Sequence, residues 1–563
     1  MFLIAGNVNA QKKVINVADF GIKSDGSDAT SSVLSALNAC KESKADTLIF
    51  PKGKYNFWPD KATEKYMFIS NNGDGLKRVV FPLNGFENLV INGQGSEFVF
   101  HGYICPFIID GSKNIQLINF SIDWKRTFHS EGIIMAVHEN AIDVEFSETF
   151  PFKVENSRLL FTDEEKRLYP FSSLLEFDSN KMETAFMAKD YYCGPDIIVE
   201  KIAERKVRLF VPGIKGTPGN VLVFGALNRD CPAITITHSV QIKLAGLDIF
   251  HCGGMGVIAQ RSRDIDLDYV RVTPSPVSGR MISITADATH FVSCSGKIVM
   301  QNCLFENQKD DATNIHGIYG LVTGKISPTS IEIKLKHELQ AGFDLVRAGE
   351  KVEFLNSASM VSYAEAFVKN VSSVNKTYLN IIFDEKVSEQ LKIGDVISLV
   401  ECQPDVVLRN CIIRKNRARG ILLGSRGKIL IENNTFHTPG AAILFEGDAR
   451  FWYEQAGVRD VKIINNIFDN CNYGVWGNAV IQFGPGIEKS KKAISRYNRN
   501  ILIEKNNFIV FDPRIINGYS IDSLVFQNNS IKKSNQYENR YANAKPFEIT
   551  ESSNIYIEAG KGN

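Results

Sequence analysis

The sequence predicts an all-β protein: a right-handed parallel β-helix that carries two inserted antiparallel β domains of barrel-like type. Three observations predict this fold. An asparagine-centred pattern recurs along the chain, two stretches alternate apolar and polar residues, and helical periodicity is confined to one segment. At 563 residues the chain exceeds the roughly 250–300 at which one globular core stops growing, which fits an elongated repeat architecture.

The repeat is centred on asparagines that have an apolar residue three positions before them and another two positions after. The intervals from Asn410 to Asn434 and from Asn506 to Asn529 are 24 and 23 residues, the length of one β-helix coil. We expect each asparagine at a turn, where it tolerates left-handed backbone and bonds to the coils above and below. A leucine-rich solenoid would show regular leucines and helices, which are missing. The asparagines are Asn302, Asn410, Asn434, Asn466, Asn506 and Asn529.

Residues 31–43 are the exception to the β pattern, because Val33, Leu34 and Leu37 fall on one helical face. Residues 28–30 offer an N-terminal cap. A helix at this place can plug the open end of the first coil. Before it, residues 1–13 read as a truncated signal or a flexible N-terminus, which favours export to the periplasm, the cell surface or the medium.

Two stretches break the coil pattern and are predicted to be the inserted antiparallel domains, at residues 126–230 and 317–401. The alternative is that they are long decorated coils. The β-helix then consists of residues 14–125, residues 231–316 with the candidate catalytic aspartates, and residues 402–563.

Composition limits the ligands. The formal net charge of +1 supplies no general attraction to nucleic acid, an anionic membrane or a polyacidic substrate, so a neutral ligand is expected. The sequence contains no stretch of about 18 apolar residues, so no membrane-spanning helix is expected. The ten cysteines lack CxxC pairs or regular histidine spacing, so no metal and no cofactor is expected. The oligomeric state stays open, with a homodimer as one option.

The densest cluster of reactive groups lies in TADATHF (285–291) and QKDDATNIHG (308–317). Asp287 precedes Asp310 by 23 residues, one coil, so the two should stack about 4.8 Å apart, with Asp311 adjacent. Crowded carboxylates push one pKa upward, and glycoside hydrolysis needs a protonated acid beside an ionised base. A calcium site is the rival interpretation, because that ion also binds clustered carboxylates.

Other polar side chains are candidates for binding a sugar. His290 and His316 follow the aspartates at similar displacements and could donate to hydroxyls, although a single histidine can also be a satisfied core residue. The loop FEGDARFWYEQAG (445–457) offers Glu446, Asp448 and Trp452, a mixture suited to gripping hydroxyls and stacking on a pyranose; a packed surface loop is the alternative.

Four arginines complete the candidates. Arg261 could reach the same groove, with a structural salt bridge as the alternative. Arg417, Arg419 and Arg426 are expected on a solvated face, paired with neighbouring acidic residues.

The opening VINVADFGIKSDGSDATSSVLSALNAC, with LIFPKGKY, resembles the N-terminal coil of pectin-active β-helix enzymes, including the polygalacturonases of glycoside hydrolase family 28. The succession Asp287, Asp310-Asp311 and His316-Gly317 is similar to that family's catalytic pattern. Two features depart from it: Thr285-Ala286-Asp287 replaces the usual Asn-Thr-Asp, and no later Arg-x-Lys signature is evident.

Over nearly the whole chain the sequence resembles glycoside hydrolase family 110. The resemblance is carried by the two insertions, GMGVIAQRS (254–262), QKDDATNIHG and FEGDARFWYEQAG. It implies an inverting exo-α-1,3-galactosidase that acts on glycans with terminal α-1,3-galactose, of blood-group B type and also linear. Resemblance to family 28 implies that Asp310 is the general acid and that Asp287 and Asp311 activate water. The alternatives are a polygalacturonase, a calcium-dependent pectate lyase and a non-catalytic β-helix adhesin.

Overall fold

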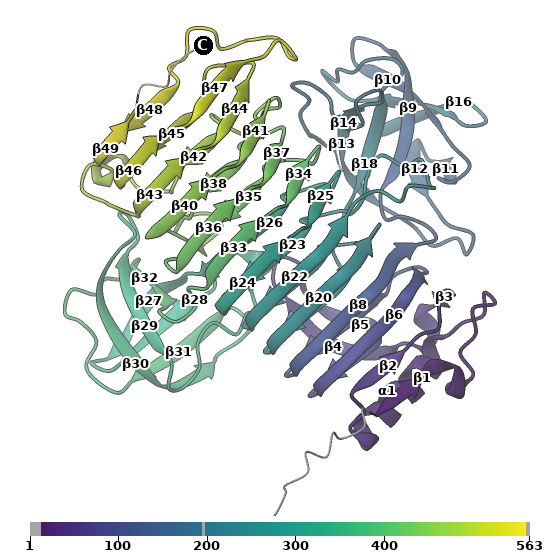
Figure 1. The fold of residues 1–563 in the computed structure, drawn as a ribbon, viewed down its shortest axis with the longest axis horizontal. Coiled ribbons are helices and arrows are strands. Elements are labelled where there is room, and N and C mark those ends of the chain that lie inside the picture. Colours follow the sequence, from purple (N-terminus) through teal and green to yellow (C-terminus); the bar gives the residue numbers. More distant parts are fainter. Residues whose placement is uncertain (1–12, 194–196, 559–563) are drawn as a thin grey trace, which may run out of the picture.

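The protein is a parallel β-helix with two antiparallel insertions, as a computed structural model that describes residues 13–193 and 197–558 shows (Figure 1). This confirms the predicted fold class. The predicted signal remnant falls mostly on residues 1–12, outside the described residues. Two sheets, of 20 and 13 strands, run along the β-helix. Within the described ranges no helix is long and apolar enough to cross a bilayer.

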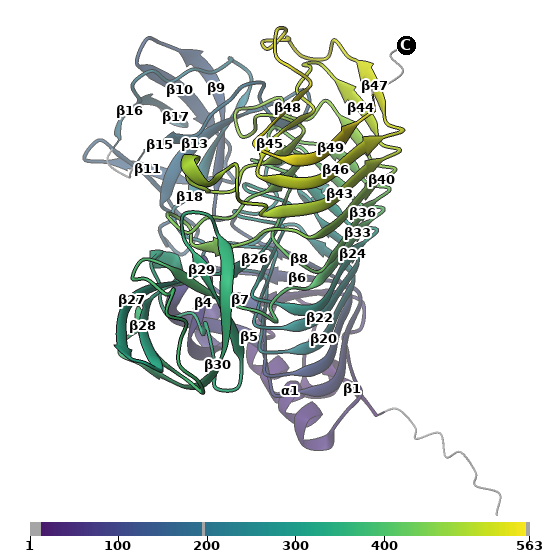
Figure 2. The ribbon, with the colours of Figure 1, turned by 90° about the vertical axis from the view of Figure 1, so that its left-hand side faces the viewer.

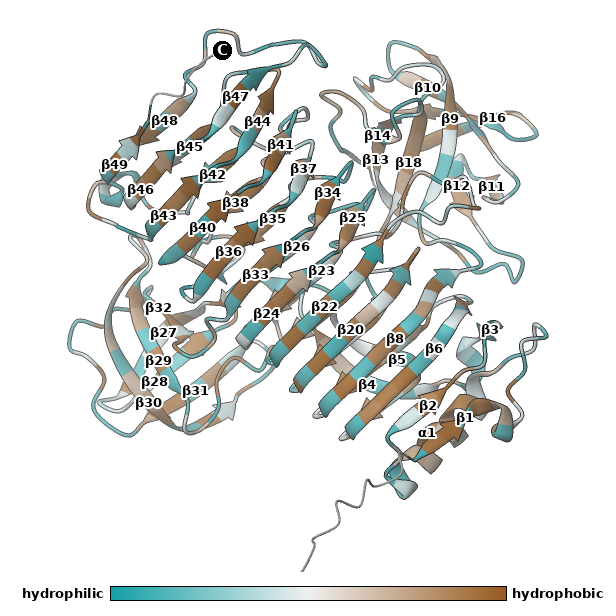
Figure 3. Cartoon of the chain, in the orientation of Figure 1, coloured by the Kyte–Doolittle hydropathy of each residue, from teal (hydrophilic) through white to brown (hydrophobic). Residues whose placement is uncertain are grey.

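Successive coils stack strand on strand in parallel register. In the larger sheet Ile242 lies beside Ile265 and Leu244 beside Leu267, so like residues repeat at each level. The side chains that face the interior form one continuous core. Figure 3 shows apolar segments recurring from strand to strand along the coils. Representative strands of this sheet are β6 (Glu87–Phe100), β8 (Lys113–Trp124), β20 (Val240–Ile249), β22 (Arg263–Val272), β24 (Ser295–Gln301), β33 (Asp405–Arg409), β36 (Lys428–Glu432), β40 (Asp460–Ile464), β43 (Asn498–Glu504) and β46 (Ile521–Gln527).

The predicted helix is α1 (Thr30–Ser43), which covers the first coils (Figure 1). Its buried face includes Val33, Ala36 and Leu37. The Asp28 carboxylate accepts the Thr30 N–H at 3.0 Å and satisfies one amide of the first turn. The helix therefore closes the end of the core, as predicted.

The asparagine repeat is an internal ladder, but the two roles predicted for each asparagine fall on two adjacent residues. Asn434, Asn466 and Asn506 each donate a backbone N–H to the side-chain oxygen of the next ladder asparagine, at 2.8–2.9 Å. At the other two positions Cys303 and Cys411 occupy this row, while the preceding Asn302 and Asn410 adopt the left-handed conformation. Each corner uses two adjacent residues, one for the turn and one for the ladder. The sequence pattern had assigned both roles to a single asparagine.

The two insertions differ in closure. The first is an antiparallel sheet of eight strands that includes β9 (Ser130–Val137), β13 (Phe171–Asp178), β15 (Tyr191–Tyr192) and β18 (Val221–Ala226). The second is a closed six-stranded barrel from β27 (Gly320–Ser327) to β32 (Val396–Leu399). Figure 2 shows both on the same side of the β-helix.

Candidate active site

A pocket of about 370 Å³ lies over the smaller β-helix sheet and contains all three candidate catalytic aspartates. Asp287 lies two residues before β23 (Thr289–Val292), and Asp310 and Asp311 lie three and two residues before β26 (Thr313–Ile318). These strands pair in parallel with Thr289 beside Thr313, and Ala288 N–H donates to the Asp311 carbonyl at 3.0 Å. The coil here is therefore 24 residues long, and Asp287 lies level with Asp311 rather than with Asp310 as predicted.

The three carboxyl groups are close together and shielded from water. One oxygen of each lies within 4.8 Å of the others, and the residues are only 3%, 8% and 2% exposed. Such crowding in a medium of low polarity opposes full ionisation. The trio of Asp287, Asp310 and Asp311 must therefore either hold protons or have cationic partners.

Arginines from distant parts of the chain supply those partners. Arg229 and Arg417 donate to separate oxygens of Asp310 at 2.6 and 2.9 Å. Arg419 grips Asp311 with its backbone N–H, Nε and Nη2 at 2.8–3.0 Å. These are charge-assisted bonds of the strong kind.

The prediction of a solvated face for the later arginines is therefore wrong. The side chains of Arg417 and Arg419 are largely buried against the trio, and Arg426 is paired with the buried Glu353 of the barrel. The sequence offered nearby acidic residues as partners, but stacking of the coils and docking of the barrel bring more distant carboxylates closer.

The three carboxyl groups of the trio differ in pKa. Burial and the neighbouring Asp310 raise the pKa of Asp287 to about 8, and burial raises the pKa of Asp311 to about 6 against the pull of Arg419. Burial also acts on Asp310, but Arg417, Arg229 and Arg419 outweigh it and hold its pKa below the ordinary value. Near neutral pH the free pocket thus contains a protonated carboxyl beside ionised ones.

One pair of neutral histidine tautomers is consistent with a proton on Asp287. The Gly317 carbonyl can only accept, so His316 donates to it through Nδ1 at 2.7 Å. A neutral His316 then accepts from His290 Nε2–H at 2.9 Å, which leaves His290 Nδ1 as an acceptor for Asp287 at 2.6 Å. Burial lowers the pKa of both histidines, that of His290 to about 4, so both are neutral. Asn71 Nδ2 lies 3.0 Å from the same Nε2 and favours the opposite tautomer, in which His290 Nδ1–H donates to an ionised Asp287; the raised pKa of Asp287 favours the first arrangement.

The structure thus gives His290 and His316 a different role from the predicted donors to sugar hydroxyls. Both lie in the pocket wall and are almost fully buried, but their ring nitrogens are engaged with Asp287, with each other and with the Gly317 carbonyl. His290 therefore contacts Asp287 directly, and His316 contacts it through His290.

The loop after β38 (Ile443–Phe445) forms one side of the pocket. Glu446 and Trp452 line it, as does Glu454, which the sequence reasoning missed. Asp448 also borders the pocket, but its carboxylate accepts the N–H groups of Arg450, Phe451 and Trp452 at 2.5–3.1 Å. Its main task is to shape the loop rather than to grip hydroxyls.

Arg261 is placed away from the pocket. Its guanidinium donates to Glu350 at 2.6 Å and lies 3.8 Å from Asp344, both in the second insertion. It therefore anchors the barrel to the coil, the salt-bridge alternative noted from the sequence.

Several pocket residues were not predicted from the sequence. Asn71 comes from the N-terminal β4–β5 hairpin (Thr63–Ile69 and Gly73–Asn84), Tyr192 from the first insertion and Leu339 from the barrel loops. Arg229 and Trp476 come from other coil connections. No motif surrounds these residues, and only the stacking of coils and insertions brings them to one place.

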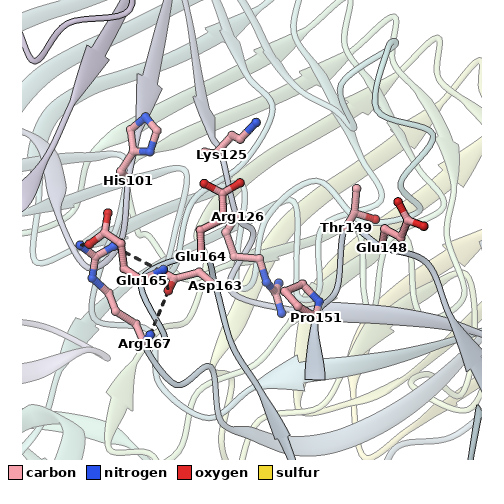
Figure 4. A pocket seen from close by; sticks show the side chains of 11 residues that line it. His101, Lys125, Arg126, Glu148, Thr149, Pro151, Asp163, Glu164, Glu165 and Arg167 are labelled. Carbon is pink, nitrogen blue, oxygen red and sulfur yellow. Dashed lines mark hydrogen bonds and ion pairs between the residues drawn. The ribbon is translucent and has the colours of Figure 1, made fainter. Parts of the chain in front are cut away.

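A second hollow, of about 310 Å³, lies beside the first insertion (Figure 4). It also contains arginines and carboxylates, but Arg167 pairs there with Asp163 and Glu165 of its own loop. Arg126 donates to backbone carbonyls, including that of Thr162 at 3.2 Å. Its charged groups order local loops, so the pocket with the trio is the candidate active site.

The trio is also the candidate cation site, since its oxygens cluster closely enough to hold a metal ion. However, Arg229 and Arg417 occupy both oxygens of Asp310, and Arg419 bonds both oxygens of Asp311. A divalent cation would have to displace or repel these guanidinium groups. The donor set does not fit calcium.

A parallel β-helix whose deep pocket holds a protonated carboxyl next to ionised ones defines a β-helix glycoside hydrolase. Family models match in the same sense: GLAA-B beta-barrel domain I at residues 130–222, GLAA-B beta-barrel domain II at 330–397 and a right-handed beta helix region at 396–560.

Two curated relatives align with nearly the whole chain. Alpha-1,3-galactosidase A of Shewanella woodyi is 39% identical over 98% of this chain and 91% of its own length. Alpha-1,3-galactosidase B of Bacteroides thetaiotaomicron is 33% identical over 95% and 89%. The chain therefore belongs to the α-1,3-galactosidase family, glycoside hydrolase family 110. A solved endo-xylogalacturonan hydrolase from Aspergillus tubingensis covers 98% of this chain and 99% of its own at 8% identity, with a TM-score of 0.42.

Proposed function

We propose that this protein is an exo-acting α-1,3-galactosidase that removes terminal α-1,3-linked galactose from glycans of blood-group B type and from linear α-1,3-galactosyl glycans. The observation that carries the proposal is the buried trio of aspartates, unevenly protonated, in the wall of a pocket. The family supplies the sugar and the linkage. A pocket of about 370 Å³ suits the capture of a chain end.

The charge of the pocket favours a neutral sugar. Six carboxyl groups line it against three guanidinium groups, so the lining is acidic. A galacturonate carboxylate would meet like charges there, and binding would carry an electrostatic cost. This argues against the pectin-active alternative, for which a basic, open groove is expected.

The trio provides both kinds of proton transfer that glycoside cleavage requires. One carboxyl protonates the leaving oxygen, and another takes a proton from the attacking water. Resemblance assigns the acid to Asp310, whereas the raised pKa of Asp287 supports a resting proton on that carboxyl group. The carboxyl oxygens lie within 4.8 Å of each other, so a single bridging water could relay the proton from one carboxyl group of the trio to another.

We also propose inversion of the anomeric centre. Both oxygens of Asp310 and of Asp311 are engaged by guanidinium donors, which makes these carboxylates poor nucleophiles and favours activated water. Inverting enzymes commonly hold their two carboxyl groups about 6.5–9.5 Å apart, whereas one oxygen of each carboxyl group of the trio lies within 4.8 Å of the others. The anomeric configuration of the galactose first released therefore tests inversion.

Proton NMR during digestion of a blood-group B trisaccharide and a linear α-1,3-galactosyl trisaccharide tests these proposals together. We expect free galactose that is initially the β-anomer, and no cleavage of polygalacturonate. Initial α-galactose would reject inversion, and cleavage of polygalacturonate alone would reject the galactosidase. Export from the cell is a separate proposal, tested by fractionating the producing cells.

A further inference from the structure

Two adjacent exposed aromatic side chains stand at the edge of the active-site pocket. Trp452 lines the pocket and is 46% exposed, and its neighbour Phe451 is 67% exposed. Exposed apolar surface that continues from a binding pocket marks an extension of the site. His337, from the second insertion, completes the group. We call His337, Phe451 and Trp452 the aromatic rim.

The rim is held in place by groups on both sides. The His337 ring lies 4.9 Å from the Trp452 ring at 33° and 5.9 Å from Phe451. The Phe451 and Trp452 rings are perpendicular, with centroids 4.9 Å apart. Asp448 fixes the loop through its backbone N–H bonds, and His337 Nδ1 accepts the Leu339 N–H at 3.3 Å. The rings are therefore presented in a set geometry before any ligand arrives.

The aromatic residues on another pocket wall are differently occupied. The guanidinium of Arg417 lies 5.6 Å from the Trp476 ring centroid and donates to the Tyr192 hydroxyl at 3.3 Å. The same guanidinium is bonded to Asp310. A sugar could use the Trp476 face only by disturbing a partner of the trio, whereas Phe451 offers uncommitted ring surface.

We propose that the aromatic rim is the subsite for the sugar next to the terminal galactose, the residue on the leaving side of the scissile bond. This inference rests on the proposed function and adds to it two specificity residues, Phe451 and His337. The C–H face of a neutral pyranose packs on aromatic rings without requiring a charge. The rim thus selects for glycans over isolated galactosides.

The test compares two substrates of different length. An α-1,3-galactosyl trisaccharide reaches the rim, whereas α-galactosyl fluoride has no sugar beyond the bond that breaks. For Phe451→Ala we expect the ratio of kcat/KM, trisaccharide over fluoride, to fall by about tenfold, mainly through KM. His337→Asn, which keeps a side-chain acceptor for the Leu339 amide, should lower the same ratio less. Phe451→Tyr, which keeps an aromatic ring at this position, should keep the wild-type ratio.

The matched control is Tyr269→Ala, an equally drastic loss of an aromatic ring that is 63% exposed on β22. It should leave both activities unchanged. A ratio that stays within twofold of wild type in both Phe451→Ala and His337→Asn would overturn the proposal, as would an equal fall in the control.

A binding measurement separates this proposal from the proposed function. The β-linked disaccharide that remains after removal of the galactose is titrated against wild type and Phe451→Ala by calorimetry, with no turnover involved. We expect weaker binding to the variant, by about tenfold in Kd. If neither substrate is cleaved yet this difference appears, the galactosidase is rejected and the rim stands as a sugar site. Equal binding to both proteins rejects the rim.

Discussion

The active-site pocket and the hollow of Figure 4 contain the same types of charged residue, but they assemble them over different distances along the chain. In the hollow, Arg167 pairs with Asp163, four residues away. In the pocket, Arg417 pairs with Asp310, 107 residues away. A pair within one loop orders that loop, whereas a pair between stacked coils can gather several buried charges at one point.

These two sites differ in what the pairs achieve, although long-range pairs such as Arg261 and Glu350, 89 residues apart, can also be structural. The Asp163 carboxylate accepts two backbone N–H groups of its own loop and the Tyr169 hydroxyl. The trio instead holds like charges together, because the β-helix places successive loops directly above one another. Crowding of that kind shifts pKa values, and shifted pKa values are what acid–base catalysis requires.

The largest expected effect comes from removing the carboxylates. Each of Asp287→Asn, Asp310→Asn and Asp311→Asn should lower kcat by about 10²–10⁴, because each removes a proton donor, an acceptor or a holder of water. The matched variant Asp163→Asn in the hollow should leave kcat unchanged. Steady-state kinetics, with circular dichroism to confirm folding, measures both. A loss of kcat in Asp163→Asn as large as in the trio would break the comparison.

An aryl α-galactoside with a good leaving group then identifies the acid. The aryl galactoside should partly restore kcat in the variant that lacks the acid and leave the variants that lack the base inactive. Resemblance to family 28 predicts that the restored variant is Asp310→Asn. Restoration of Asp287→Asn would give the role to the carboxyl that holds the resting proton. Equal restoration of all three would contradict a division of roles within the trio.

The next effect comes from the arginines. Arg419→Gln leaves Asp311 buried without its cation, and breaking a buried pair in this way costs about 3–5 kcal/mol of stability as an upper range, because the arginine is partly exposed. The pKa of Asp311 should rise further. Arg167→Gln in the hollow should cost much less, since one of its partners is half exposed. Urea denaturation of both variants measures the difference, and equal losses would contradict it.

A smaller effect is expected from pH. Because the pKa values of Asp311 and Asp287 are raised to about 6 and about 8, kcat/KM should be bell-shaped, with limbs near those values that belong to the coupled trio. A carboxyl with a raised folded-state pKa stabilises the fold at low pH and loses that contribution as pH rises. The Tm of Asp287→Asn should therefore fall less than that of wild type between about pH 5 and pH 9. A flat profile would contradict the uneven trio.

The smallest expected effect is that of chelation. Arginines neutralise the acidic cluster, so EDTA should leave activity intact. Activity is measured before and after dialysis against the chelator, and then with added calcium. Loss with recovery on calcium would reassign the trio to metal binding and favour the lyase alternative.

Much of this protein could be predicted from local patterns. The helix over the first coil follows from the spacing of Val33 and Leu37, and the insertions follow from strand alternation. The trio was found because aspartates one coil apart must lie near each other in any β-helix. The prediction failed by one residue, since the coil between Asp287 and Asp311 is 24 residues long. The geometry of the corners sets the length of each coil. Because the coils of this repeat differ in length, the length of one particular coil could not be predicted from the sequence.

By itself, then, the sequence determined the β-helix, its cap, its two insertions and the place of the three aspartates, because apolar periodicity and repeat length act locally. Only the tertiary structure decided which groups surround the aspartates. Arg229 and Arg419 are 81 and 108 residues from their partners, and Asn71 and His337 come from separate hairpins and loops. Contacts between distant segments depend on how coils stack and insertions dock, and this is where the partners that tune the pKa values are chosen.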